Sequence, residues 1–285
     1  MKNKVIITIP VYKATMDKYE KISYIRCLEI LNKYKICIVT YKKNNLNEYI
    51  KLAQKYKINI LTEFFDFKNF KSIQSYNNFM LSINFYKRFK EFEYILIYQL
   101  DAYVFRDELE EWCKKKYSYI GAPIFKGGRK CDKNSEYMQC MNGGLSLRNT
   151  KDMINILSDI RKIYIFENKY ERQNLISKIK AIIKILTIKN DYDLEIANNY
   201  HEDILLSKIF IEKINNFKSR PKFWDKVIKI RTNIYNLPSF NESYKFSFEE
   251  NIEYLSTLYN NSLPTFCHAF QLEYKRTFWN KHITL

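Results

Sequence analysis

The chain has 285 residues, of which 46% are hydrophobic and 16% aromatic. This is ample apolar material for a packed core, and it excludes a mostly disordered chain. The formal net charge is +17, but 38 of the 48 basic residues are Lys and only 10 are Arg. Because Arg is the residue preferred for bidentate contacts to bases and phosphates, this composition argues against a nucleic-acid partner while still favouring attraction to some anion.

Neither the N-terminus nor the cysteines indicate export. The apolar run in MKNKVIITIP is too short for a signal peptide, and no stretch approaches the ~18 apolar residues of a membrane-spanning helix. The six cysteines form no C-x-x-C pair, which excludes zinc-ribbon and thioredoxin-like sites. Several lie in apolar patterns that suit reduced, buried thiols. We therefore expect a cytoplasmic protein.

Strand and helix patterns alternate through the first hundred residues. Helical spacing of apolar residues predicts helices at 17–31, at 47–56 with Asn47 as the N-cap, and at 72–89. Continuous apolar runs predict buried strands at 5–9, 36–40, 58–62 and 94–100. This alternation is typical of a βαβ architecture with a parallel sheet.

The order of elements changes after residue 105. The patterns predict a short helix at 107–115 and a strand at 117–120, followed by a glycine-bearing stretch at 121–144. A further strand is predicted at 145–148, and a helix capped by Thr150 at 150–163. Further helices are predicted at 171–188, 201–214 and 249–258. Because neither a repeat nor a Gly/Pro/Ser linker interrupts the chain, one continuous α/β domain is the simpler interpretation.

A candidate binding rim lies where the predicted strands end, because ligands of open α/β sheets bind beyond the carboxyl ends of the strands. Asp101 directly follows the buried run YILIYQL. A carboxylate there needs a partner, which a divalent cation or a sugar hydroxyl would supply. The alternative is a turn cap, since Asp is common in turns. The position of Asp101 slightly favours a binding role over a turn cap. The remaining rim segments are 10–13, 41–42 and 62–65.

The five glycines all lie between Gly121 and Gly144. Adjacent glycines at 143–144 permit positive φ and a close approach of the backbone to a ligand. A tight turn into the following strand would need no ligand. Asn142 and Arg148 favour a ligand, because they supply an amide and a fixed positive charge.

Two further acidic sites and a lone histidine complete the candidates. Glu202 and Asp203 open a predicted helix, where they serve either as helix-dipole acids or as a general base for a hydroxyl. Asp191 and Asp193 follow a basic helix in polar sequence and are interpreted as a solvated turn. His268, in PTFCHAFQ, is either a hydrogen-bonded core residue or a second metal ligand beside Asp101.

The motifs IPVYK, YILIYQLDAYVF, YIGAPIF, MNGGLSLR, HEDILLS and CHAFQ occur in this order along the chain. The ordered set resembles the DUF5672 family, a glycosyltransferase-like group of GT-A fold, over roughly residues 4–270. The resemblance implies an α/β, GT-A-like (Rossmann-like) three-layer sandwich with a mainly parallel central sheet and extra C-terminal helices. It implies a single domain over 1–285, with a nucleotide-binding half of about 1–105 and an acceptor/catalytic half of about 106–285.

The resemblance also implies an activity. The expected enzyme is a hexosyltransferase that moves a sugar from a nucleotide-sugar donor to a hydroxyl of a glycan or glycolipid acceptor. A UDP-sugar is the expected donor, and the anomeric configuration is expected to invert. The expected process is surface-polysaccharide synthesis. In GT-A enzymes a D-x-D motif after the fourth strand holds a divalent metal. Here Asp101 matches the first acid and Tyr103 replaces the second. Either Asp101 with His268 holds Mn²⁺ or Mg²⁺, or Lys and Arg neutralise the pyrophosphate instead.

Site residues carry over position by position. Asp203, with Glu202, matches the catalytic acid pair, and Asp203 is the preferred base. The expected donor and nucleotide-binding residues are Pro10, Val11, Tyr12, Tyr41, Gln99, Asp101 and Tyr103. The expected donor-sugar and acceptor residues are Gly121, Asn142, Gly143, Gly144 and Arg148.

Two other interpretations stay open. The net charge and the amphipathic basic pattern at 171–188 suit a noncatalytic binding module for nucleic acid or an anionic membrane, and the same pattern would give an enzyme peripheral contact with the inner face of the cell membrane. A helix that packs its apolar face on the core is the favoured explanation of 171–188. Alternatively, Tyr103 marks a lectin-like protein that keeps the fold without the activity.

Overall fold

The computed structural model describes residues 3–139, 141–158, 202–203, 206 and 235–284. The chain divides into two compact units. The first consists of Met1–Phe70, Glu91–Asn149 and Asn236–Leu285, and the second of Lys71–Lys90 and Thr150–Tyr235. The division of a single domain into halves near residue 105 stays a prediction.

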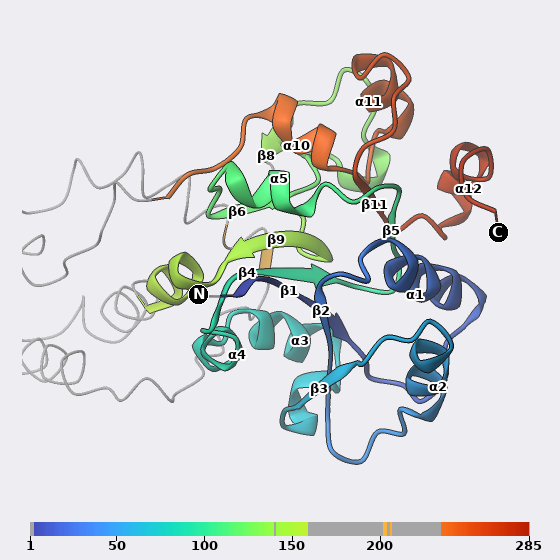
Figure 1. The fold of residues 1–285 in the computed structure, drawn as a ribbon. Coiled ribbons are helices and arrows are strands. Elements are labelled where there is room, and N and C mark those ends of the chain that lie inside the picture. The colour runs from blue at the N-terminus through green and yellow to red at the C-terminus, as the bar shows by residue number, and fades with distance from the viewer. Residues whose placement is uncertain (1–2, 140, 159–201, 204–205, 207–234, 285) are drawn as a thin grey trace, which may run out of the picture. The chain divides into compact units, whose positions relative to one another are not determined.

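The centre of the first unit is a mainly parallel sheet (Figure 1). Its described strands follow the order β3-β2-β1-β4-β9-β6. β1 pairs in parallel with β2 and with β4, and β2 pairs in parallel with β3, whereas β9 runs antiparallel to both β4 and β6. The predicted α/β class with a mainly parallel central sheet is confirmed. In chain order the strands span Asn3–Pro10 (β1), Lys35–Thr40 (β2), Leu61–Phe64 (β3), Phe92–Tyr98 (β4), Tyr119–Gly121 (β6) and Leu145–Asn149 (β9).

Helices α1 (Lys18–Ile30) and α2 (Asn47–Lys55) connect the first three strands. α1 begins at a capping box, in which Asp17 accepts from the Glu20 N–H at 2.9 Å and Glu20 accepts from the Asp17 N–H at 2.8 Å. The predicted N-cap of α2 is wrong by one residue. Leu46 is the N-cap and makes no side-chain cap bond, so Asn47 is the first helical residue.

A smaller sheet brings distant parts of the chain together. β11 (Phe266–His268) lies between β5 (Ala102–Val104), which is antiparallel to it, and β10 (Ser247–Phe248), which is parallel to it. Neither β5 nor β10 was predicted, because each has only two or three residues and is too short to show a pattern. The glycine-bearing stretch forms a hairpin of β7 (Ile124–Phe125) and β8 (Tyr137–Gln139) around a 3₁₀ turn at Gly128–Lys130.

Short helices complete the first unit. The extra C-terminal helices are present, and two of them, α10 and α12, were not predicted individually. α5 confirms the helix expected at 107–115. The bounds are Phe67–Phe70 (the 3₁₀ helix η1), Leu109–Lys114 (α5), Phe240–Phe246 (α10), Ile252–Leu258 (α11) and Glu273–Trp279 (α12).

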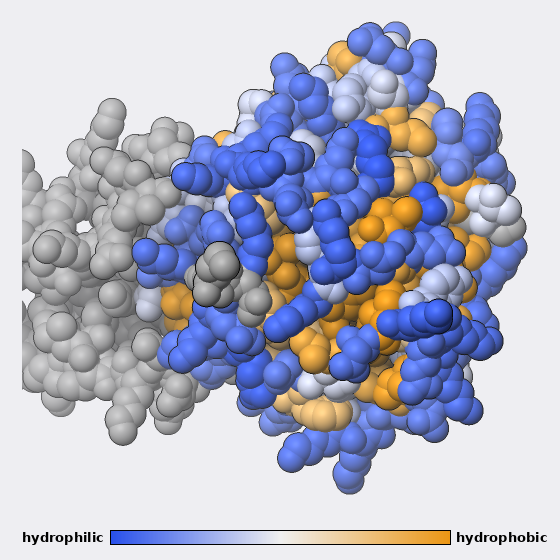
Figure 2. All heavy atoms as spheres, viewed as in Figure 1, coloured by the Kyte–Doolittle hydropathy of each residue, from blue (hydrophilic) through white to orange (hydrophobic). Residues whose placement is uncertain are grey.

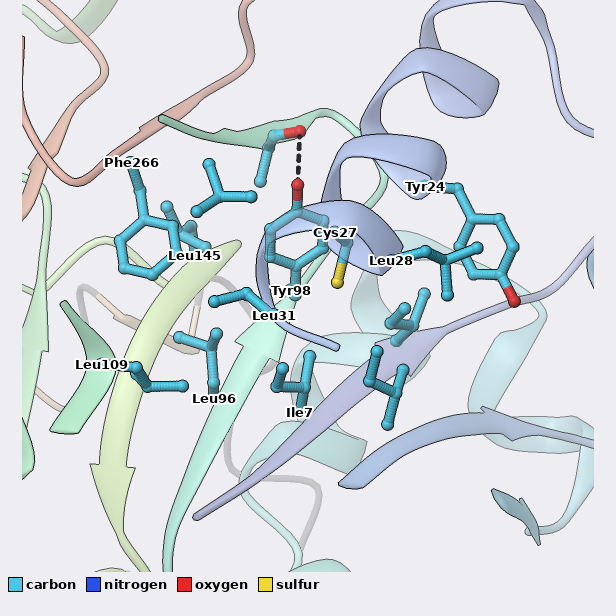
Figure 3. Packing of buried hydrophobic residues seen from close by; sticks show 14 of the residues in the cluster. Ile7, Tyr24, Cys27, Leu28, Leu31, Leu96, Tyr98, Leu109, Leu145 and Phe266 are labelled. Atoms are coloured by element: carbon cyan, nitrogen blue, oxygen red, sulfur yellow. Dashed lines mark hydrogen bonds between the residues drawn. The ribbon is translucent and has the colours of Figure 1, made fainter. Parts of the chain in front are cut away.

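The main core of the first unit packs one face of the central sheet against α1, α2 and α5. Alternate residues along each strand face the same side of a sheet, and the strands contribute Ile7, Leu96 and Leu145 to this cluster. Figure 3 shows Tyr98 at the end of β4 among these side chains, close to Cys27 of α1. The Tyr98 hydroxyl donates a hydrogen bond to the Ala102 carbonyl at 3.3 Å, which ties the end of β4 to β5.

The second unit contains α3 (Ile73–Met80) and α4 (Ile83–Arg88). The sequence predicted one helix here, but α3 ends at Met80 with Leu81 as its C-cap, and Ser82 caps α4 by accepting from the Asn84 N–H. Thr150 is itself helical, and its buried hydroxyl has no hydrogen-bond partner among the described residues, so the predicted cap is wrong. The helix predicted at 171–188, and most of the one at 201–214, lie outside the described residues.

On the face of the molecule that Figure 2 shows, hydrophilic residues cover most of the described surface, and hydrophobic residues are visible between them. Among the helices of the described residues, none combines the length and the apolar character needed to cross a membrane.

Candidate active site

The strand order of the first unit has a switch point beside β1. From β1 the chain proceeds to β2 and β3 on one side, and then places β4 on the other side of β1 (Figure 1). Ligands of open α/β sheets bind outside the carboxyl ends of the strands at such a switch point. β1 ends at Pro10 and β4 at Tyr98, so the loops that begin at Val11 and Gln99 flank this point.

Hydrogen bonds join the loops after β1 and β2. The Thr40 hydroxyl donates to the Val11 carbonyl at 2.7 Å, and the Tyr41 hydroxyl donates to the Tyr12 carbonyl at 3.5 Å. Val11 places its side chain in the core and is 2% exposed, whereas Tyr12 is 60% exposed. The predicted nucleotide-binding segments therefore lie together, and Tyr12 is the one with a large accessible side chain.

The loop after β4 is a tight turn that presents Asp101. The Ala102 N–H donates to the Gln99 carbonyl at 2.9 Å, and the Gln99 N–H donates to the Gly144 carbonyl at 3.1 Å. Ala102 pairs directly with His268 in the small sheet. Asp101 is therefore held beside His268 by the register of β5 and β11.

Glu249 completes a row of three charged residues. Phe248 pairs with Cys267, so Glu249, one residue further along, lies beside His268 on the other side of β11. His268 Nε2 lies 3.0 Å from Asp101 Oδ1, and His268 Nδ1 lies 3.0 Å from Glu249 Oε1. Neither contact has the direction of a hydrogen bond, so both are close ion contacts. Gln271 adds a long hydrogen bond, 3.5 Å from its Nε2 to Asp101 Oδ2.

The opposite charges of Asp101, His268 and Glu249 stabilise the ionised form of each of these groups. Burial opposes a charge on the imidazole, but Asp101 and Glu249 outweigh it and raise the pKa of His268 to about 10. Burial also opposes the two carboxylates, but the His268 cation outweighs it and lowers the pKa of Asp101 and the pKa of Glu249. At neutral pH the row is therefore a carboxylate, an imidazolium and a second carboxylate.

Two of the predicted site glycines are needed because other atoms approach closely. A Cβ on Gly144 would lie 2.1 Å from His268 Nε2 and 2.7 Å from Gln99 Oε1. A Cβ on Gly121 would lie 2.4 Å from the Asn142 carbonyl oxygen. Positive φ, the other reason the sequence suggested, occurs in the hairpin turn at Gly127 and Gly128.

Asn142 and Arg148 shape the turn before β9. Asn142 Oδ1 accepts from the N–H groups of Gly144 at 3.2 Å and Leu145 at 3.3 Å. Arg148 is fully buried, donates from Nη2 to the Gly143 carbonyl at 3.0 Å and lies over the Tyr119 ring. These contacts join both side chains to the protein itself, and their role toward a sugar stays a prediction.

Tyr103 and the acid pair each have their own described contacts. Tyr103 contacts Phe105 and Phe270 in an aromatic cluster and lies under the Arg26 guanidinium. Glu202 and Asp203 belong to the second compact unit. Glu202 is buried and its Oε2 accepts from the Asp203 N–H at 3.0 Å, while the Asp203 side chain is partly exposed. The catalytic role of this pair stays a prediction.

The predicted pair of metal ligands does not fit a metal ion in this arrangement. A ring nitrogen must face the ion to bind a metal, but here each ring nitrogen of His268 faces a carboxylate oxygen at 3.0 Å. Within the described ranges, no group of three or more His, Cys, Asp or Glu is arranged to hold a metal ion.

The sequence interpretation missed Glu249 and Gln271. Glu249 follows the short run KFSF, in which Lys and Ser alternate with Phe, so the rule that selected Asp101, an acid directly after a long apolar run, does not select it. Gln271 ends the CHAFQ motif. Neither residue is near Asp101 in the chain, and only the small sheet brings them together.

Comparisons with known proteins identify the family. A family model described as "Protein of unknown function (DUF5672)" matches residues 59–268, which is more than half of the chain. A search of curated proteins finds no match.

Several solved structures are similar to this chain. The WbbM bifunctional glycosyltransferase matches with a TM-score of 0.46 and 13% identity, over 94% of this chain and 46% of its own. Mouse xyloside xylosyltransferase 1 matches with a TM-score of 0.46 and 9% identity, over 93% and 97%. S. aureus TarS 1-349 matches with a TM-score of 0.36 and 13% identity, over 80% and 78%. No activity is transferred from these three proteins at such scores. The match to the family model is the decisive comparison, and by it the chain belongs to the DUF5672 family.

Proposed function

We propose that this chain is a glycosyltransferase of GT-A type that transfers a sugar from a nucleotide-sugar donor to a hydroxyl of a glycan or glycolipid acceptor. One observation carries the proposal. A partly exposed carboxylate, Asp101, lies at the carboxyl end of β4, at the switch point of a mainly parallel sheet where nucleotides bind in α/β proteins. The finer parts of the proposal are a UDP-sugar donor, a hexosyl group, a cytoplasmic location and a role in surface-polysaccharide synthesis.

In the proposed binding mode the nucleotide lies over the loops after β1 and β2, and the donor reaches Asp101. Tyr12 offers its exposed ring for stacking on the base. Tyr41 contacts Phe67, with ring centroids 4.8 Å apart, and is held beside Tyr12. Asp101 accepts hydrogen bonds from hydroxyl groups of the donor, as an ionised carboxylate does.

The proposed reaction is a single displacement. Asp203 takes the proton of the acceptor hydroxyl, and the acceptor oxygen forms a bond to the anomeric carbon of the donor. The bond from that carbon to the diphosphate oxygen breaks, and the nucleoside diphosphate leaves with the electron pair. The configuration inverts because the acceptor attacks opposite the leaving group. Holding both reactants in line accounts for much of the expected acceleration.

Cationic side chains neutralise the departing diphosphate in this proposal. Tyr103 stands where the GT-A motif has its second acid, and His268 is held between two carboxylates. No step is therefore assigned to a metal ion, and Mn²⁺ enters as one arm of the test.

Thermal shift with nucleoside diphosphates tests the proposal. The full-length chain is heated with UDP, GDP, ADP or dTDP, each with and without Mn²⁺. Binding to the folded state raises the midpoint by mass action, so we expect stabilisation by one of them, UDP first. Absence of stabilisation by all four in both arms contradicts the proposal. Binding to DNA and to anionic vesicles that falls steeply with salt would support a basic binding module instead.

Replacement of the proposed base separates catalysis from binding. Asp203→Asn keeps the size of the side chain but removes its basicity, so we expect transfer to fall at least a hundredfold, as for loss of a general base. The nucleotide affinity should stay within about twofold, because Asp203 has no proposed contact with the nucleotide. Asp193→Asn makes the same chemical change in the polar sequence before the motif and should leave both unchanged. If transfer survives in Asp203→Asn, the base is assigned wrongly.

A further inference from the structure

Glu249 has no role in the reaction proposed above, yet it is a buried acid next to the candidate site. Its side chain is 15% exposed, against 9% for His268 and 29% for Asp101. Glu249 thus contacts His268, and His268 contacts Asp101. Of the three side chains, that of Asp101 is the most exposed. A buried acid costs solvation energy unless a partner offsets it, and the partner here is the imidazole.

We propose that Glu249 and His268 are positioning residues for Asp101, with Glu249 fixing the imidazole and the imidazole holding the Asp101 carboxylate in the orientation that binds the donor. What Asp101 binds rests on the proposed function. The geometric chain from Glu249 to Asp101 does not.

The backbone fixes this chain of contacts. β10, β11 and β5 lie side by side, and adjacent strands in a sheet are about 4.8 Å apart. The register sets Glu249, His268 and Asp101 next to one another across these strands. The His268 ring on the middle strand therefore reaches a carboxylate on each side. Its Nε2 lies 3.0 Å from Asp101 Oδ1, and its Nδ1 lies 3.0 Å from Glu249 Oε1.

Gly144 restricts the imidazole from a third side. A Cβ there would lie 2.4 Å from His268 Cε1 and 2.1 Å from Nε2, so the ring lies directly on the glycine backbone. The same glycine accepts the Gln99 N–H through its carbonyl and so anchors the turn that carries Asp101. One residue therefore contacts the ring and supports the turn, which is the kind of support that keeps a functional side chain in place.

The contact with His268 is specific to Glu249 among the two adjacent acids that follow β10. The neighbouring acid Glu250 provides the contrast, because it bonds Tyr274 at 3.1 Å and Lys275 at 3.3 Å and does not contact His268 in any described interaction.

The first test measures the contact chain without any nucleotide. The chain has 3 histidines, so the ring signals of His268 are assigned by comparing the ¹⁵N-labelled protein with His268→Gln, in EDTA. We expect Glu249→Gln to lower the pH at which this ring loses its proton by at least one pH unit, because one of the two carboxylates that stabilise the cation is gone. Glu253→Gln, the same change at an exposed site on α11, should have no effect. Equal titration of His268 in both variants would overturn the inference.

The second test measures coupling to the donor site in the folded, full-length chain. UDP affinity is determined by calorimetry for Glu249→Gln, Asp101→Asn and the double variant, with circular dichroism to show that each is folded. We expect each single change to weaken UDP binding roughly tenfold, and the double variant to bind no more weakly than Asp101→Asn, since Glu249 acts through Asp101. Independent, multiplying losses would contradict the positioning role.

The two failures are distinguishable. If the wild-type chain binds no nucleoside diphosphate, the proposed function is wrong, while the titration of His268 still decides whether Glu249 controls the imidazole. If UDP binds normally to Glu249→Gln, the positioning role is wrong and the proposed function stands.

Discussion

Gly144 lacks a side chain because the His268 ring occupies the space that one would need. This is a requirement of packing, since the backbone at Gly144 is not among those with positive φ. Gly128 shows the opposite case. Its φ is +54, and a Cβ there would meet nothing within 4 Å. Glycine is therefore required at Gly144 by the space around it and favoured at Gly128 by its backbone conformation.

Alanine substitutions should distinguish these two reasons. Gly144→Ala forces the buried ring or Gln99 to move, and overpacking of this kind costs about 2–3 kcal/mol of unfolding free energy. Gly128→Ala strains the left-handed backbone and costs about 1 kcal/mol. Urea unfolding of both variants measures the difference. Only Gly144→Ala should also weaken nucleotide binding. Equal losses of stability and unchanged binding would show that His268 is free to move away.

The charge on His268 predicts a pH dependence of stability. Folding raises the pKa of this imidazole from 6.5 to about 10. Its contribution is therefore complete below pH 6.5 and is lost as the pH rises through 10. The unfolding free energies of the wild type and His268→Gln should differ more near pH 6 than near pH 10.5. A difference that is constant between these pH values would mean that folding does not shift the pKa of His268, and a smaller difference near pH 6 would mean that the ring is neutral in the folded chain.

At the scale of elements, α1 and α2 begin in different ways. α1 has the capping box of Asp17 and Glu20, whereas Leu46 caps α2 without a side-chain bond. Asp17→Ala should therefore reduce the unfolding free energy by about 1 kcal/mol. Asn47→Ala, at the N-cap predicted from sequence, should cost less than half of that. Guanidinium unfolding compares the two, and equal losses would restore Asn47 as a cap.

The long elements were predictable and the short ones were not. β1, β2 and β4 are continuous apolar runs with parallel pairing, and such runs are a strong signal. β5 and β10 are too short to have a period. The break between α3 and α4 at Ser82 was missed because the apolar spacing continues across it, and a Ser cap competes locally with helix continuation.

The same limit explains what was predicted of the candidate site. Asp101 was found because it follows a long buried strand, so its position needed no tertiary information. Its neighbours His268 and Glu249 come from β11 and the end of β10, and their proximity follows from pairing over more than 140 residues of sequence separation. His268 was selected because the chain has only 3 histidines and this one lies in an apolar segment, and it was predicted to be a metal ligand. That role does not fit, because a second carboxylate, that of Glu249, contacts the ring nitrogen that does not face Asp101.

At the scale of the whole molecule, the switch point between β1 and β4 is the place of the proposed nucleotide site. The net charge of +17 adds a general attraction for a diphosphate, but it does not select a site. The first unit carries the switch point and Asp101, and the acid pair belongs to the second unit. The proposed nucleotide site at Asp101 therefore lies in the first unit.

Calorimetric titration of UDP into the wild type, Asp101→Asn and Glu91→Gln tests the central claim most directly. Glu91 is exposed and lies just before the first residue of β4, so Glu91→Gln makes a comparable change at the opposite end of the same strand. The switch-point site predicts that the wild type and Glu91→Gln bind UDP equally and that Asp101→Asn binds it roughly tenfold more weakly. Equal binding by all three, or no binding by the wild type to UDP or the other nucleoside diphosphates, would contradict it.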